Sequence, residues 1–221
     1  MEDFLFGLTN YVWVVNYRVN ALVMKDIIDR KDFRFMLGYT QYYSILETFK
    51  KDHEGENLTL LERMFFDTEK FELLQKDCIL SVCNNLNVPN HRLSLNSLKE
   101  EKSFVISPFC DKDRNRFLAN PNWIKSQVPI FVDNPLKNLK AKLKLVGKIK
   151  TLRFKMNTET GILKIDFNLY PDSKYDQEII FGQKAGKEDQ LLEYMEYIKS
   201  EHKIYNSSEL NVVERLVSHA A

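Results

Sequence analysis

The sequence predicts an α+β protein in which a helical N-terminal bundle packs with a C-terminal antiparallel three-stranded meander and two closing helices. Three observations support this prediction. In the first 86 residues apolar side chains recur at spacings of three and four, five of the six prolines fall between residues 89 and 135, and apolar and polar residues alternate from Leu139 onward. We expect a bundle over 1–88, an irregular proline-rich connection over 89–136, and the meander with two helices over 137–221, which can all belong to one continuous domain.

The N-terminal bundle is expected to contain three antiparallel helices. A broad apolar stripe predicts the first, which ends near Asp29, and favours a helix buried among others over a coiled-coil dimer. The second is expected over residues 31–51. Thr59 and Glu62 have the spacing of a capping box, which predicts a third helix over residues 59–86. The stripe of the first helix consists of Leu5, Leu8, Val12, Val15, Val19 and Leu22.

The proline-rich connection is expected to be mostly loop, because proline interrupts both helices and central strands. Within it the residue pattern predicts a short helix over 94–101 and a second helix over 111–120. Short apolar runs predict strands at 104–106 and 130–132.

The meander begins with a strand whose outward positions are rich in lysine. The apolar positions change parity between Ile149 and Leu152, which predicts a bulge near Thr151. Residues 158–161 then form a predicted hairpin loop, with Gly161 in the left-handed conformation. This loop fixes a register that pairs Met156 with Leu163, Phe154 with Ile165, Leu152 with Phe167, and Arg153 with Asp166.

The C-terminal segment completes the meander and adds two helices. A turn at 171–173 precedes a third strand at 178–181. A helix is expected over 188–203, and Ser207 or Ser208 is expected to cap a last helix that carries Leu210, Val213, Leu216 and Val217.

A basic window is the strongest local bias in the chain. From Asp133 to Glu159 there is no acidic side chain between the two ends, while the whole chain has a net charge of only +1. A row of cations on one strand face can bind a polyanion or an acidic partner. Lysines on an exposed strand can equally serve to prevent edge-to-edge aggregation. The candidate binding residues are Lys140, Lys142, Lys144, Lys148, Lys150, Arg153 and Lys155.

Signatures of catalysis, cofactors and metals are missing from the sequence. Cys78 and Cys83 are five residues apart on a predicted helix and would point in different directions, so they cannot share a metal ion. His91 and Cys110 could meet only through folding. No phosphate-binding or dinucleotide-binding glycine motif occurs. We therefore predict no catalytic residue, no metal site and no cofactor.

One short segment resembles a known ribonuclease family. Arg114-Asn115-Arg116 after a helical unit resembles the HEPN superfamily, whose site pairs an arginine, often followed by asparagine, with a histidine that four to six residues separate from it. Asn120 occupies this range and no histidine does, and only three residues separate Arg215 from His219. The family is therefore not assigned. Together with the acidic cluster of Asp172, Asp176 and Glu178, this resemblance leaves a nuclease as an alternative.

The function predicted from the sequence is a non-enzymatic binding or regulatory protein that engages nucleic acid or an acidic protein surface through the lysine-rich strand. The alternatives are an RNA-cleaving or metal-dependent nuclease whose site combines distant segments, and a partner-binding inhibitor or scaffold. An odd number of cysteines favours a reducing cytoplasmic setting. The apolar run at 4–15 is too short and too interrupted for a membrane span, so we expect no membrane partner. The lysine and asparagine content is compatible with a bacterial or phage origin.

Overall fold

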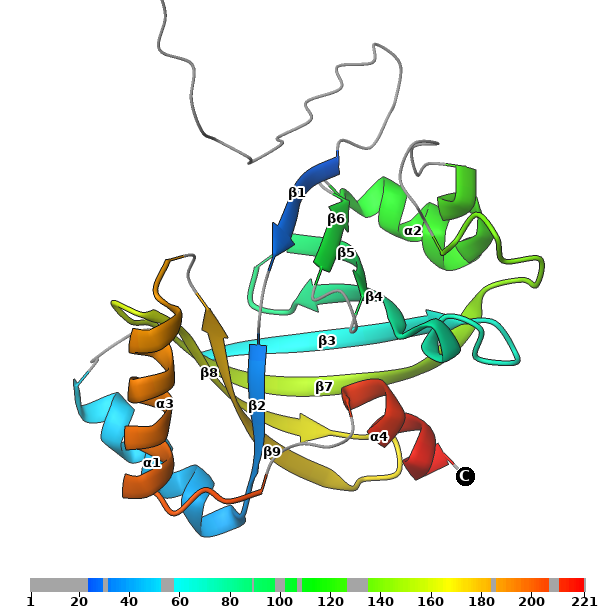
Figure 1. Cartoon of the computed structure of the whole chain (residues 1–221). Coiled ribbons are helices and arrows are strands. Elements are labelled where there is room, and N and C mark those ends of the chain that lie inside the picture. Colours follow the sequence, from blue (N-terminus) through cyan, green and yellow to red (C-terminus); the bar gives the residue numbers. More distant parts are fainter. Residues whose placement is uncertain are drawn as a thin grey trace, which may run out of the picture.

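The computed structural model describes most of the chain, and one antiparallel sheet runs through it (Figure 1). The described residues are 24–29, 32–52, 58–88, 90–97, 102–106, 109–126, 135–183, 186–206 and 211–220. Nine strands lie in these ranges: β1 (Met24–Asp29), β2 (Asp32–Leu37), β3 (Leu58–Asp67), β4 (Cys78–Asn85), β5 (Asn90–Ser97), β6 (Lys102–Ile106), β7 (Lys144–Asn157), β8 (Gly161–Leu169) and β9 (Tyr175–Gln183). The helices there are α1 (Tyr39–Asp52), α2 (Asp111–Ala119), α3 (Glu188–Glu201) and α4 (Val212–Ala220), with short 3₁₀ turns η1 (Leu74–Lys76) and η2 (Pro121–Ser126).

The two edges of the sheet are joined by one continuous segment of chain. The strand order is β1-β6-β5-β4-β3-β7-β8-β9-β2, so β1 and β2 are the outermost strands. Only two residues separate β1 from β2 in the sequence. Strand β1 pairs with β6, and β2, which follows it directly in the sequence, pairs with β9 at the opposite edge of the sheet. The sheet therefore curls round into a barrel. We call the concave face of this sheet the interior and the other face the outer face.

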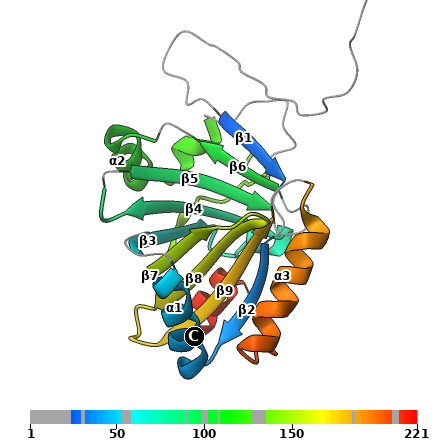
Figure 2. The same cartoon turned by 90° about the vertical axis from the view of Figure 1, so that its left-hand side faces the viewer.

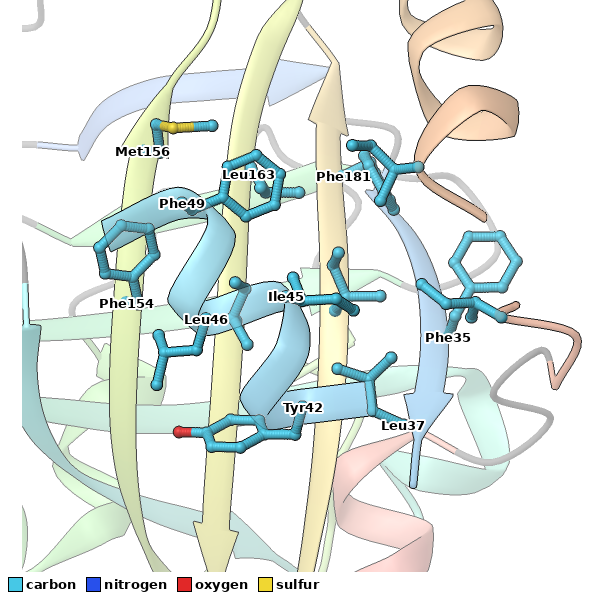
Figure 3. Packing of buried hydrophobic residues seen from close by; sticks show 14 of the residues in the cluster. Phe35, Leu37, Tyr42, Ile45, Leu46, Phe49, Phe154, Met156, Leu163 and Phe181 are labelled. Atoms are coloured by element: carbon cyan, nitrogen blue, oxygen red, sulfur yellow. The ribbon is translucent and has the colours of Figure 1, made fainter. Parts of the chain in front are cut away.

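Most helices cover the outer face. A large apolar cluster lies between α1, α3 and the strands β7, β8, β9 and β2. Figure 3 shows Tyr42, Ile45, Leu46 and Phe49 of α1 directed at these strands. A second cluster packs α2 and η2 against β3, β4 and β5. Only α4 lies on the interior side among the described helices, and Figure 2 shows it behind the strands that α1 covers from the front.

The predicted helical N-terminal bundle is wrong, because residues 24–29, 32–37, 58–67 and 78–85 are strands. The sequence pattern misled because β3 buries apolar residues on both of its faces. Met64 joins the outer cluster, whereas Phe65 packs on the interior side. An apolar run without strict alternation looks helical in the sequence. Thr59 and Glu62 accordingly lie within a strand and cap no helix, although α1 confirms the C-terminal part of the helix expected over 31–51.

The proline-rich connection is more regular than expected. Residues 94–97 belong to strand β5 and not to a helix, because they pair with β4. The strand at 104–106 and the helix at 111–120 are confirmed as β6 and α2. The strand predicted at 130–132 and most of the first predicted helix lie outside the described residues.

The register expected for the hairpin of residues 152–167 is confirmed, although the hairpin belongs to a larger sheet and not to a separate three-stranded meander. Met156 pairs with Leu163, Phe154 with Ile165, and Leu152 with Phe167. The strand at 178–181 and the helix after it are confirmed as parts of β9 and as α3. The sheet that contains the meander has nine strands among the described residues, where the sequence predicted three.

Two details of the meander differ from the prediction. The irregularity in β7 lies opposite Phe65 and Phe66, not near Thr151, and the apolar parity changes because Ile149 packs against α4 on the interior side. Gly161 does not adopt the left-handed conformation, since Gly186 is the positive-φ glycine of the described residues. Gly161 is needed for another reason: an added Cβ would lie 2.3 Å from the carbonyl oxygen of Gly182.

Helix α4 begins at Val212, and Asn211 just before it is the capping residue, not Ser207 or Ser208 as expected. The side-chain oxygen of Asn211 accepts hydrogen bonds from the backbone amides of Val213 and Glu214 at 2.9 and 3.0 Å. The Glu214 carboxylate accepts in return from the amide of Asn211 at 2.7 Å. Ser207 and Ser208 lie outside the described residues. None of the helices in the described part of the chain is long and apolar enough to cross a membrane.

Candidate functional site

The interior of the barrel carries a concentrated set of charged side chains. Because side chains alternate along a strand, the registers of β2, β3, β5, β7, β8 and β9 direct every second residue inward. Seven cations and four carboxylates share this face or reach it from α4: Arg34, Arg63, Arg92, Arg153, Lys155, Lys164 and Arg215, with Asp32, Asp166, Asp176 and Glu178. Charges this close together in a partly enclosed site interact strongly.

Arg153 and Asp166 form a two-pronged ion pair across β7 and β8. Nε of Arg153 donates to one oxygen of Asp166 at 2.7 Å, and the NH2 nitrogen donates to the other at 2.5 Å. This pair was expected from the hairpin register and is confirmed. Asp166 is fully buried, so the geometry of the pair must offset the cost of removing its charge from water.

Glu178 is the central carboxylate of the interior and is also fully buried. Its oxygens lie 3.6 Å from Arg34 and 3.0 Å from Arg215, and one of them accepts a hydrogen bond from Asn168 at 3.3 Å. Burial raises the pKa of Glu178, but the guanidinium groups of Arg34, Arg215 and Arg63 outweigh burial and hold this pKa at about 2. Glu178 therefore carries its negative charge throughout the neutral range.

Arg63 has neutral hydrogen-bonding partners, whereas Arg34, Arg153 and Arg215 contact carboxylates. Its guanidinium donates to Oγ1 of Thr151 at 3.1 and 2.9 Å and to Oδ1 of Asn168 at 2.7 Å. No carboxylate in the described part of the chain lies within ion-pair distance of it. Burial lowers the pKa of Arg63, and the more distant Asp166 and Glu178 oppose this effect. A half-buried guanidinium with neutral partners is a site where an anion gains a strong charge-assisted hydrogen bond.

The end of the interior away from α4 carries further cations. Arg92 and Lys155 are exposed there, and Nζ of Lys164 lies 3.4 Å from Asp32. Cys83 occupies the neighbouring interior position, opposite both Arg63 and Arg92 in the strand registers. Burial raises the pKa of the Cys83 thiol, although Arg63, Arg153 and Arg92 act in the opposite direction. Arg92 and Lys155 therefore add exposed positive charge on this side of Arg63.

The interior carboxylates do not form a metal site in the described residues. No group of three histidine, cysteine, aspartate or glutamate side chains there could hold a metal ion. Asp166, Glu178 and Asp176 are each held by an arginine. These residues therefore do not fit a divalent cation, and we assign no step to one.

The structure separates the seven candidate residues of the lysine-rich strand. Lys140 and Lys142 precede β7, and Lys144 begins it, 3.6 Å from Glu69. Lys148 and Lys150 lie opposite Met64 and Glu62 on the outer face. Arg153 and Lys155 lie on the interior face. These residues do not form one face, and a binding role for them stays a prediction.

The other candidates from the sequence are not brought together. Cys78 and Cys83 lie on opposite faces of β4, and the cysteines of the chain are free thiols. His91 contacts Asp111 at 2.7 Å and Asn84 at 3.0 Å, whereas Cys110 donates to Asp113. Asp176 and Glu178 do face the interior, but Asp172 lies in the turn beside Lys174.

Sequence reasoning missed Arg34, Arg63, Lys164 and Arg215. A usable signal was present in β8, where Lys164, Asp166 and Asn168 alternate with the apolar residues Leu163, Ile165, Phe167 and Leu169. Such alternation is expected for strands whose polar face is enclosed and whose apolar face packs on helices. The alternation was not interpreted in this way because the barrel itself was not predicted.

Comparisons with known proteins place the fold. No protein-family model matches the sequence, and no curated protein does either. Among solved structures, a proposed adenylate cyclase from Bacillus halodurans is similar with a TM-score of 0.66 and 17% identity, covering 85% of this chain and 98% of that one. A proposed adenylyl cyclase from Hippeastrum is described as having a dominant triphosphatase activity. Its TM-score is 0.62 and its sequence identity 18%, and the match covers 87% of this chain and 96% of that one. A proposed adenylate cyclase from Vibrio parahaemolyticus has a TM-score of 0.53 and 10% sequence identity, and the match covers 87% of this chain and 99% of that one.

These likenesses show that the chain shares the fold of the three proteins. The predicted non-enzymatic protein that binds nucleic acid through a lysine-rich strand is wrong on two counts. The fold is shared with proteins described as proposed adenylate cyclases, one of them with a dominant triphosphatase activity, and the lysines do not share one face. The resemblance to HEPN ribonucleases also loses its context, because it required a helical N-terminal unit.

Proposed function

We propose that the protein binds a short linear phosphate chain, as found in tripolyphosphate or a nucleoside triphosphate, in the interior of the barrel and hydrolyses its terminal anhydride. The position of Arg63 supports this proposal most directly. Its half-buried guanidinium has only neutral hydrogen-bonding partners, so a phosphate oxygen can add to it without displacing a carboxylate.

The surrounding charges suit a chain of several phosphates. Arg153 and Arg34 act electrostatically on Arg63 and are matched by Asp166 and Glu178, whereas Arg92 and Lys155 are exposed. A phosphate chain that extends from Arg63 toward Arg92 and Lys155 therefore meets cations at successive positions. Two interior residues on one strand are about 6.6 Å apart.

Hydrolysis by this arrangement would rely mainly on positioning and charge stabilisation. Water attacks the terminal phosphorus, the bond to the bridging oxygen breaks, and the leaving chain departs one phosphate shorter. Negative charge spreads over the phosphoryl oxygens during this transfer, and fixed guanidinium groups in a partly enclosed site stabilise it. The triphosphatase activity described for the Hippeastrum protein of the same fold agrees with this proposal. We also place the protein in the cytoplasm, where its free cysteines would stay reduced.

The proposed activity is tested with purified protein and a panel of phosphates. Tripolyphosphate, ATP, GTP, pyrophosphate and AMP are each incubated with the protein, with and without added Mg²⁺ or Mn²⁺. We expect phosphate release from the triphosphates and none from AMP, and nucleotide products are separated so that cyclisation would be seen. An Arg63→Gln preparation purified in parallel controls for contaminating phosphatases. If tripolyphosphate neither binds in calorimetry nor is cleaved under any of these conditions, the proposed function is wrong.

A further inference from the structure

Helix α4 occupies one end of the barrel interior. Its apolar residues Val212, Val213 and Leu216 form a cluster with Phe65, Ile79, Ile149 and Tyr170 of the surrounding strands and turn. The contact with β7 is close, because an added Cβ on Gly147 would lie 2.8 Å from Cδ2 of Leu216. The helix therefore packs directly on the interior face, as Figure 1 shows for α4 in front of β7.

Ionic contacts fix α4 in this position. Nε of Arg215 lies 2.8 Å from Asp176, and its NH2 nitrogen lies 3.0 Å from Glu178. Nε also donates to the hydroxyl of Tyr170 at 3.2 Å, and that hydroxyl donates to Asp176. Arg215 is almost fully buried. Releasing α4 would break this network and leave the buried Glu178 and the largely buried Asp176 with fewer partners, which is costly.

The interior is consequently asymmetric along its length. At the α4 end it is filled by apolar side chains and by the Arg215 network. At the other end Arg92 and Lys155 are exposed to solvent. Between them, Thr151, which accepts hydrogen bonds from Arg63 of β3, lies four residues along β7 from Lys155, a distance of roughly 13 Å.

We propose that α4, held by Arg215, makes the interior a blind site that admits only the end of a phosphate chain. This inference rests on the proposed function and specifies its substrate class. A linear chain would enter past Lys155 and Arg92, place its terminal phosphate near Arg63, and stop at α4. Arg215 thus acts as a positioning residue for α4 and does not touch the chain. Long polyphosphate could not thread through the barrel, so cleavage would remove only terminal phosphates.

Binding stoichiometry tests the blind site without relying on catalysis. Linear polyphosphates of increasing length are titrated with the protein at physiological ionic strength, and the complexes are analysed by sedimentation. We expect no more than two proteins on each chain, whatever its length, because each chain has two ends. The number of proteins should not rise with chain length. A Lys148→Gln, Lys150→Gln double variant removes outer-face lysines and controls for non-specific attachment.

Cleavage products give a second and independent readout. Products from long chains are expected to be phosphate and chains shortened from their ends, without early fragments of intermediate length. A Gly147→Leu variant should displace Leu216 and loosen α4, which limited proteolysis of the C-terminus would show, and it should permit internal cleavage. A Val217→Ala variant at the half-buried margin of the cluster serves as the control that keeps α4 in place.

The outcomes separate the two proposals. If wild-type protein does not bind tripolyphosphate, the proposed function itself fails. If it binds tripolyphosphate but loads many copies per long chain or cuts chains internally, the proposed function stands and the blind site is wrong. The blind site is also wrong if proteolysis shows α4 released in the Gly147→Leu protein while products and stoichiometry stay unchanged.

Discussion

Replacement of Arg63 by glutamine is expected to weaken tripolyphosphate binding at least 30-fold while the barrel stays folded. A hydrogen-bonded, partly buried charge pair loses about 2–5 kcal/mol when one partner is truncated, and about 2 kcal/mol corresponds to a 30-fold change in Kd. The fold should tolerate the change because Oγ1 of Thr151 donates to Asn168 at 2.8 Å without Arg63. Titration calorimetry measures the affinity, and circular dichroism checks the fold.

Matched control variants test whether the loss of tripolyphosphate affinity in Arg63→Gln is specific to Arg63. Lys148→Gln and Lys150→Gln remove cations of the neighbouring strand whose side chains lie on the outer face. They are expected to change the affinity for tripolyphosphate less than threefold at physiological salt. Arg63→Lys keeps the charge but cannot form the same set of directed hydrogen bonds, so an intermediate affinity is expected. Equal weakening by the outer-face variants and by Arg63→Gln would show that binding is non-specific attraction to a basic surface.

Glu178→Gln is expected to give the largest loss of stability among single substitutions in the interior. The fully buried carboxylate lies between Arg34 and Arg215, and both guanidinium groups would lose a charged partner. Breaking a buried ion pair from one side costs on the order of 3 kcal/mol, which corresponds to a fall in Tm of roughly 6–12 °C for a chain of this size. Thermal unfolding measures the effect. The control Glu196→Gln removes an exposed carboxylate paired with Lys199 and should change stability by less than about 0.5 kcal/mol.

The stability effect of Glu178→Gln is also expected to depend on pH in the acid range. Arginine neighbours hold the pKa of Glu178 at about 2 in the folded protein, below its ordinary value of 4.5. A carboxyl group with a lowered folded-state pKa stabilises the protein above its unfolded-state pKa, and this contribution is lost as the pH falls toward the folded-state pKa. The difference in unfolding free energy between wild type and Glu178→Gln should therefore shrink as the pH falls from about 4.5 to about 2. A difference that stays constant over this range would contradict the assigned role of the Glu178 charge.

Local pairing was predictable from the sequence where one face of a strand is apolar throughout. In β7 and β8 the residues from Leu152 to Met156 and from Leu163 to Phe167 alternate regularly, and a short loop joins them, so the register followed from local chemistry alone. In β3 the same reasoning failed. Met64 and Phe65 pack on opposite faces, so the run lacks the alternation that identifies a strand.

The candidate site could not be predicted because its residues come from strands that the sequence pattern did not identify. Arg34 lies on β2 and Arg63 on β3, both of which were expected to be helical. Arg215 reaches Asp176 and Glu178 only because α4 packs inside the barrel. A local sequence pattern does not show on which face of a sheet a helix packs. The pair of Arg153 and Asp166 was predictable, since both residues belong to one hairpin.

The central claim, that a phosphate chain binds inside the barrel, is tested most directly by protection of Cys83 from alkylation. Cys83 lies on the interior face beside Arg63 and Arg92, whereas Cys110 is exposed just before α2 and provides an internal control. Because burial raises the pKa of Cys83, labelling is followed by mass spectrometry at an alkaline pH where the thiolate forms. Saturating tripolyphosphate is expected to slow labelling of Cys83 at least fivefold and to leave Cys110 unchanged. Labelling of Cys83 that is unaffected by bound tripolyphosphate would place the anion elsewhere and contradict the claim.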